Sequence, residues 1–93
     1  EAAQRMHGTE LKKALISWRS SGARVHRYER ELLPLADDRA AAALAAYRGG
    51  SGDLGMTLVA LDAAIEMRLA YADLLGTLGQ AWATLHFAFP QER

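Results

Sequence analysis

Apolar residues recur at helical spacing on both sides of a glycine-rich segment in the middle of the chain. In the first half, the apolar residues of one helix face are Leu11, Leu15, Trp18, Val25, Leu32 and Leu35. This spacing, followed by the alanine-rich stretch 40–47, predicts a helical arm over about 10–48. Pro34 lies inside this arm, where its missing amide donor and its ring predict a kink or a break.

The second half predicts another helical arm, over about 55–88, before Pro90. At 100° per residue, the polar positions of this arm gather on one narrow arc: Asp62, Glu66, Asp73, Thr77, Gln80 and Thr84. The opposite arc is apolar and has two edges, the first with Leu61, Ile65, Ala72, Leu75 and Trp82, the second with Met67, Tyr71, Leu74, Leu78, Ala81 and Leu85. Arg68 and His86 interrupt this arc. Each edge is a near-heptad seam, and two seams predict helical neighbours on both sides.

Four of the eight glycines lie in the stretch 49–55, which predicts a tight reversal at about 49–54. The expected fold is therefore all-α, a long antiparallel helical hairpin of coiled-coil type. We interpret residues 1–93 as a single fragment of a longer protein, because the chain begins at Glu1 without a Met. A hairpin core is one layer thick and offsets chain entropy poorly. We expect the isolated chain to associate into a helical bundle, in the simplest case as a dimer of hairpins.

Composition agrees with long helices and narrows the function. Nineteen Ala and fourteen Leu stand against two Val, two Ile and two Phe. The 11 basic and 11 acidic residues cancel, so nothing favours binding to nucleic acid. The absence of cysteine excludes disulfides and thiolate metal sites. No apolar run approaches the roughly 20 residues of a membrane span, and no signal peptide is visible.

The residues around the turn resemble the TolC-like outer membrane efflux family. The stretch 32–36, Leu-Leu-Pro-Leu-Ala, leads through an alanine-rich helix to the turn, and the positions that match the family pattern are Tyr47, Gly50, Asp53, Leu54, Leu58 and Ala60. The later stretches Arg68-Leu69 and 81–85 are most similar to the heavy-metal branch, of the CzcC and CusC type.

The resemblance implies a function for the whole chain. Family members are homotrimers in which a β-barrel in the outer membrane continues into a long periplasmic α-barrel built from such hairpins. The turns form the tunnel tip, which opens when a periplasmic adaptor and an inner-membrane pump engage. This chain would be the periplasmic α-barrel hairpin of a tripartite exporter of heavy metals or drugs in a Gram-negative cell envelope. Met56 and Val59 stand where well-studied members carry acids, so an acidic constriction is not expected there.

At the tip itself, we expect two structural roles. Leu54 and Leu58 lie one helical turn apart and can pack back against the first arm near Tyr47. Asp53 precedes the second arm, where its carboxylate can cap free amides.

Other candidate chemistry is weak. The histidines His7, His26 and His86 share no ligand spacing, and Met6, Met56 and Met67 are far apart. Asp37-Asp38 and Glu29-Glu31 are typical of a solvated helix face. The glycine segment lacks a P-loop lysine, and no serine has a spaced base. We expect neither enzymatic activity nor a metal or cofactor.

Two other functions remain open. The main alternative is a coiled-coil interaction module, such as an exporter adaptor hairpin or a scaffold, which needs only one seam and any short loop. A membrane-surface amphipathic helix is disfavoured, because Arg68 is the only Lys or Arg in the second arm.

Overall fold

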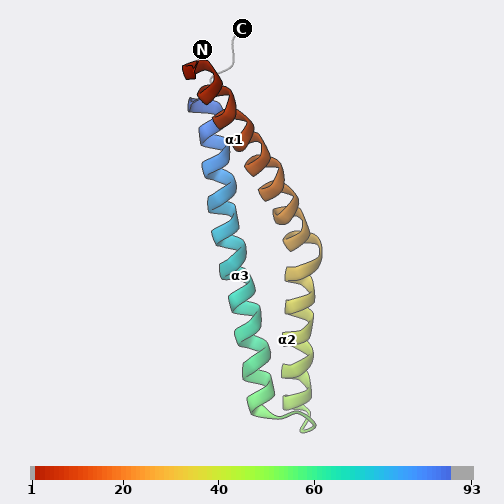
Figure 1. Cartoon of the computed structure of the whole chain (residues 1–93). Coiled ribbons are helices and arrows are strands. Elements are labelled where there is room, and N and C mark those ends of the chain that lie inside the picture. Colours follow the sequence, from red (N-terminus) through yellow and green to blue (C-terminus); the bar gives the residue numbers. More distant parts are fainter. Residues whose placement is uncertain (1, 89–93) are drawn as a thin grey trace. The chain divides into compact units, whose positions relative to one another are not determined.

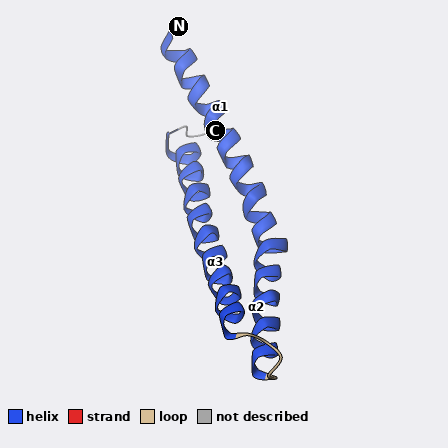
Figure 2. Cartoon of the chain, turned by 60° about the horizontal axis from the view of Figure 1, so that its bottom comes forward, coloured by secondary structure: helices blue, strands red, loops and turns tan. Residues whose placement is uncertain are grey.

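The computed structural model describes residues 2–88, with side chains for 8–87, and these residues form an all-α helical hairpin (Figures 1 and 2). The first arm comprises α1 (Ala2–Arg27), a π-helical turn η1 (Tyr28–Leu32) and α2 (Leu33–Arg48). The second comprises α3 (Leu54–Ala83) and a π-helical turn η2 (Thr84–Ala88). No strand occurs within 2–88, so the predicted fold class is confirmed.

The first arm begins earlier than predicted, at Ala2 instead of about Glu10. The helix continues through two isolated glycines, Gly8 and Gly22. A glycine inside a helix costs about 1 kcal/mol relative to alanine, which weakens a helix without ending it.

The chain divides into two compact units, and each unit contains parts of both arms. The turn unit spans His26–Ala72. The terminal unit contains the described residues up to Val25 together with those from Asp73 onward.

In the turn unit, α3 places one seam in the hairpin interface. Thr57 and Ala64 are buried, and Ala60, Met67 and Tyr71 on the same face are half-buried. On the first arm near the turn, Ala40 is buried, and Ala36, Asp37, Ala43, Leu44 and Ala46 are half-buried. The buried residues of this interface, Ala40, Thr57 and Ala64, are all small, which allows the two backbones to approach closely, and the Thr57 hydroxyl lies 3.3 Å from the Ala43 carbonyl.

The π-helical turn explains why Ala36 and Ala40, and not Leu35, take the less exposed positions after Pro34. The amide of Leu33 donates to the carbonyl oxygen of Tyr28, five residues earlier, so η1 holds one more residue than an α-helical turn. Pro34 does not break the arm, because this wider turn precedes it, keeps the chain helical and relieves the crowding that a proline ring imposes on the preceding turn. The extra residue rotates the following face, so that Ala36 and Ala40 point inward and Leu35 remains 47% exposed.

The terminal unit continues the same hairpin seam on α3. Leu74 and Ala81 are buried and Leu78 and Leu85 are half-buried, while α1 contributes buried Ala14, Ser21 and Val25. Thus the second predicted edge, from Met67 to Leu85, is the edge that the hairpin buries. None of the described side chains falls below 2% exposure, as expected for a core one layer thick.

The first predicted edge is left on the surface of α3, and with five further positions that continue its spacing, Leu54, Leu58, Arg68, Gly79 and His86, it forms a stripe that we term the outer seam. Its positions alternate three and four residues apart along α3 and η2: Leu54, Leu58, Leu61, Ile65, Arg68, Ala72, Leu75, Gly79, Trp82 and His86. Leu61 is half-buried, and the other nine residues are exposed. The hairpin therefore satisfies one of the two seams on α3.

Leu74 is the largest strongly buried side chain, with 5% exposure, so its truncation tests the hairpin seam. We expect Leu74→Ala to lower the free energy of unfolding by about 2 kcal/mol or more. Ile16→Ala, at a position that is 61% exposed, should change it by no more than about 0.5 kcal/mol. Urea unfolding followed by circular dichroism at one protein concentration measures both. Equal losses in the two variants would show that the assigned seam is wrong.

Candidate functional site

The turn between the arms is held almost entirely by the end of α2. The amide of Gly49 donates to the Ala45 carbonyl at 2.9 Å, and that of Gly50 donates to Tyr47 at 3.0 Å. The amides of Ser51 and Gly52 both donate to the Ala46 carbonyl at 2.9 Å. These bonds satisfy carbonyls that a helix end leaves without partners.

Two glycines in this turn are required by geometry. Gly50 has φ +84°, in the left-handed region that side chains disfavour. At Gly52 a Cβ atom would lie 2.7 Å from the Tyr47 nitrogen and 2.9 Å from the Ala46 carbonyl carbon. The backbone of the turn therefore folds directly onto the last turn of α2, a closeness that only glycine permits.

Asp53 caps α3, as the sequence indicated. Its Oδ2 accepts the amide of Met56 at 3.2 Å, three residues into the helix. The next contact was not foreseen: Thr57 is only 2% exposed, and its hydroxyl lies 2.9 Å from the Asp53 carbonyl and 3.3 Å from the Ala43 carbonyl on the first arm. Thr57 is the residue that joins the start of α3 to α2.

The predicted tip residues lie together at the turn end, and most of them face solvent. Leu54 is 49% exposed, Leu58 is 55% exposed and Tyr47 is 43% exposed. The expectation that the two leucines pack back near Tyr47 is thus corrected. They belong to the outer seam, and Thr57 occupies the inward position because it lies on the hairpin seam. Ala60 is half-buried in that same seam.

An apolar groove lies on another side of the turn unit. The larger residues that line it are Leu32, Leu35, Arg39, Met56, Val59 and Met67. Met56 and Val59 are both well exposed, so this surface near the turn is hydrophobic.

Polar contacts between the arms flank the hairpin seam in the turn unit. Arg68 on α3 pairs with Asp37 on α2 at 2.5 Å, and the Tyr71 hydroxyl donates to Glu29, while the rings of Tyr71 and Tyr28 stack at 6.2 Å. The sequence indicated solvated carboxylates on the first arm. Glu29 is exposed and Asp37 is half-buried, and both contact the second arm.

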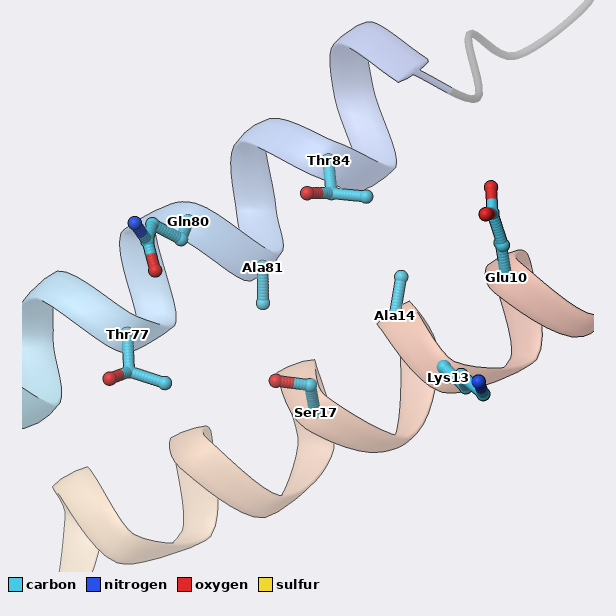
Figure 3. A pocket seen from close by; sticks show the side chains of 8 residues that line it. All are labelled: Glu10, Lys13, Ala14, Ser17, Thr77, Gln80, Ala81 and Thr84. Carbon is cyan, nitrogen blue, oxygen red and sulfur yellow. The ribbon is translucent and has the colours of Figure 1, made fainter.

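The terminal unit has a more polar groove between α1 and α3 (Figure 3). Ala14 and Ala81 lie at its floor, and polar side chains from both helices line its sides: Glu10, Lys13, Ser17, Thr77, Gln80 and Thr84. The threonines and Gln80 belong to the predicted polar arc. Small residues beneath polar ones make an open groove, and among the described residues no catalytic groups converge in it.

The histidines do not come together. His26 and His86 are exposed, His7 lies outside the residues with described side chains, and no group of three His, Cys, Asp or Glu residues with metal-binding placement occurs in the described part. His86 contacts the carbonyl of Trp82 through Nδ1 at 3.1 Å, and the two rings stack at 4.3 Å.

Comparison with known protein families, with curated proteins and with solved structures gave no match to this chain. The structural assignment of the site therefore depends on the turn, the groove and the outer seam themselves.

The close approach at Gly52 gives a sharp test of the turn. We expect Gly52→Ala to lower the free energy of unfolding by at least about 1 kcal/mol, because its Cβ meets fixed backbone atoms. Gly22→Ala is the matched control. Nothing lies within 4 Å of a Cβ there, so it should stabilise the helix by up to about 1 kcal/mol. Thermal unfolding of both variants measures the difference, and a stable Gly52→Ala variant would contradict this geometry.

The contact between Tyr71 and Glu29 predicts a change at alkaline pH. The hydrogen bond to Glu29, with smaller effects of desolvation and of the carboxylate charge, raises the pKa of Tyr71 above its usual 10.0. A raised pKa in the folded state means that this stabilisation is present below pH 10 and is lost as the pH rises through the folded pKa. Tyr71→Phe should lack this loss, so the stability gap between wild type and variant should narrow above pH 10 in urea unfolding curves. A constant gap would argue against the contact.

Proposed function

We propose that this chain is a periplasmic α-barrel hairpin of a trimeric outer-membrane efflux channel, which works in a tripartite exporter of heavy metals or drugs. One observation carries the proposal: α3 leaves a second apolar seam exposed along its length after the hairpin seam is buried. A helix in a barrel wall needs two such seams, because it has a neighbour on each side.

The turn supports the tunnel-tip assignment. Tyr47, Leu54 and Leu58 match the family pattern and present apolar surface at the extreme end of the hairpin. The turn is tied to α2 by backbone hydrogen bonds alone, apart from the Ser51 hydroxyl. Few side-chain contacts make local rearrangement inexpensive, which suits a closure that opens when a periplasmic adaptor and an inner-membrane pump dock.

The proposal locates this segment in the periplasm and assigns membrane insertion to other parts of the intact protein. No helix within the described residues is both long enough and apolar enough to span a bilayer. Neither catalysis nor a resident metal has a part in the proposal, and exported ions would pass as cargo.

The second candidate function is a coiled-coil interaction module. The long antiparallel helices support it as well as they support the barrel segment. A two-helix module of that kind needs the hairpin seam only. The outer seam, nine of whose ten residues are exposed, favours the barrel segment, because a barrel wall gives each helix a second helical neighbour along its whole length, whereas a module needs a second stripe only where its partner binds.

The test is efflux in cells that carry variants of the intact protein at equal expression. Leu54→Asp and Leu58→Asp should reduce tolerance to the exported metal or drug, because a charge at the exposed tip disturbs closure or adaptor docking. His26→Ala and His86→Ala serve as controls and should leave tolerance nearly unchanged, as should His7→Ala.

Either of two results would overturn the proposal. If the histidine variants lose tolerance while the leucine variants keep it, a metal-site function replaces the tunnel tip. If all variants keep wild-type tolerance, the turn has no role in export and the interaction module is favoured.

A further inference from the structure

We infer that the outer seam of α3 binds the outer seam of a second copy of this chain in antiparallel orientation. The inference concerns the chain by itself and holds whether or not it belongs to an efflux channel.

The spacing of the outer seam matches itself when reversed. From Leu54 to His86 the positions alternate four and three apart, and the pattern is symmetric about residue 70. Two antiparallel copies centred there use all ten positions, as Leu54 with His86, Leu58 with Trp82, Leu61 with Gly79, Ile65 with Leu75, and Arg68 with Ala72. In two of these layers, Leu61 with Gly79 and Arg68 with Ala72, a large side chain meets a small one, which is the complementarity that helix packing requires.

Arg68 selects the antiparallel orientation. In a parallel dimer in register, the two Arg68 guanidinium groups would face each other within the apolar seam, and like charges there are costly. In the antiparallel dimer each Arg68 faces the small Ala72 of the partner. Its charge remains paired with Asp37 of its own chain at 2.5 Å, and its aliphatic stem can cover the seam.

The charge distribution favours the same orientation. The turn unit, residues 26–72, holds five basic and seven acidic residues, whereas the rest of the chain holds six basic and four acidic residues. An antiparallel partner places each half beside the half of opposite net charge, and a parallel partner places like halves together. The effect is modest and screened by salt, but it adds to that of Arg68 in orienting the pair.

Leu69 completes the interface. It is 66% exposed and lies on α3 beside the seam, one residue from the centre of symmetry. In the antiparallel dimer the two copies of Leu69 lie next to each other across the two-fold axis. The same surface then serves both partners, so association closes at two copies and does not propagate.

Light scattering of the 93-residue chain at tens of micromolar tests the stoichiometry and the surface. Wild type should be a dimer. Ile65→Asp should raise the dimer dissociation constant by about tenfold or more, whereas Ala70→Asp, exposed on the other side of α3, should leave it unchanged. A folded wild-type monomer, or a dimer that only Ala70→Asp disrupts, overturns the inference.

Cysteine cross-linking tests the orientation of the two copies. The chain has no cysteine of its own, so any disulfide must form between the introduced residues. Leu61→Cys and Gly79→Cys are prepared as separate proteins of different tagged mass. Under oxidation each alone should remain largely uncross-linked, and the mixture should give the mixed disulfide. Strong cross-linking of each protein with itself indicates a parallel pair and overturns the inference.

The experiments on the dimer and those on the efflux channel can give independent results. A purified chain that is monomeric while Leu54→Asp abolishes metal or drug tolerance removes the dimer and leaves the channel. An antiparallel dimer together with full tolerance in every tip variant removes the channel and leaves the dimer.

Discussion

The structure depends on one constraint: in a hairpin of two helices, each helix can bury only the face that meets the other. α3 has apolar residues on two faces, and the hairpin covers the face that runs from Thr57 to Leu85. The outer seam is left exposed as a direct consequence. No rearrangement within one hairpin can bury both seams, because turning α3 to cover one uncovers the other. A further helix must supply the missing contact.

The composition of the buried seam makes this need stronger. Most of its strongly buried residues are small, such as Ala14, Ala40, Ala64 and Ala81, so the arms approach closely but remove little apolar area from water per residue. The hydrophobic contribution scales with that area. Pairs such as Arg68 with Asp37 add register more than stability, since exposed ion pairs are worth only about 0–1 kcal/mol. The register of the two arms is therefore well specified, but the contacts between them contribute little to the free energy of folding.

Much of this architecture could be predicted from the sequence, because it follows from local signals. The glycine cluster marks the reversal, the period of apolar residues marks the helices, and Asp53 occupies the position of a helix cap. The contacts between the arms could not be predicted. The π-helical turn adds one residue ahead of Pro34 and rotates the face that follows, so Ala36 replaces Leu35 at the interface. A prediction from a regular period of 3.6 residues does not include such an added residue.

In the candidate site, too, the local features could be predicted from the sequence and the contacts between the arms could not. Its location at the turn followed from the sequence, but the inward residue did not. A threonine between apolar neighbours gives no signal that its hydroxyl will meet a carbonyl on the other arm, as that of Thr57 does at Ala43. Likewise, only the fold shows why Gly52 must be glycine. The sequence gives no sign that the Glu29 carboxylate has a partner, because Tyr71 lies 42 residues further along the chain.

Arg68 and Gly79 interrupt the apolar row of the outer seam, and both affect how a partner helix can bind to it. A uniform row of leucines would bind tightly but in many registers and in both orientations. Arg68 and Gly79 lower the possible affinity and exclude the alignments that would place two guanidinium groups or two gaps opposite each other. In the proposed barrel the same logic applies, because helices that run up and down alternately also present antiparallel neighbours. The imperfection of the seam thus specifies which helix can cover it.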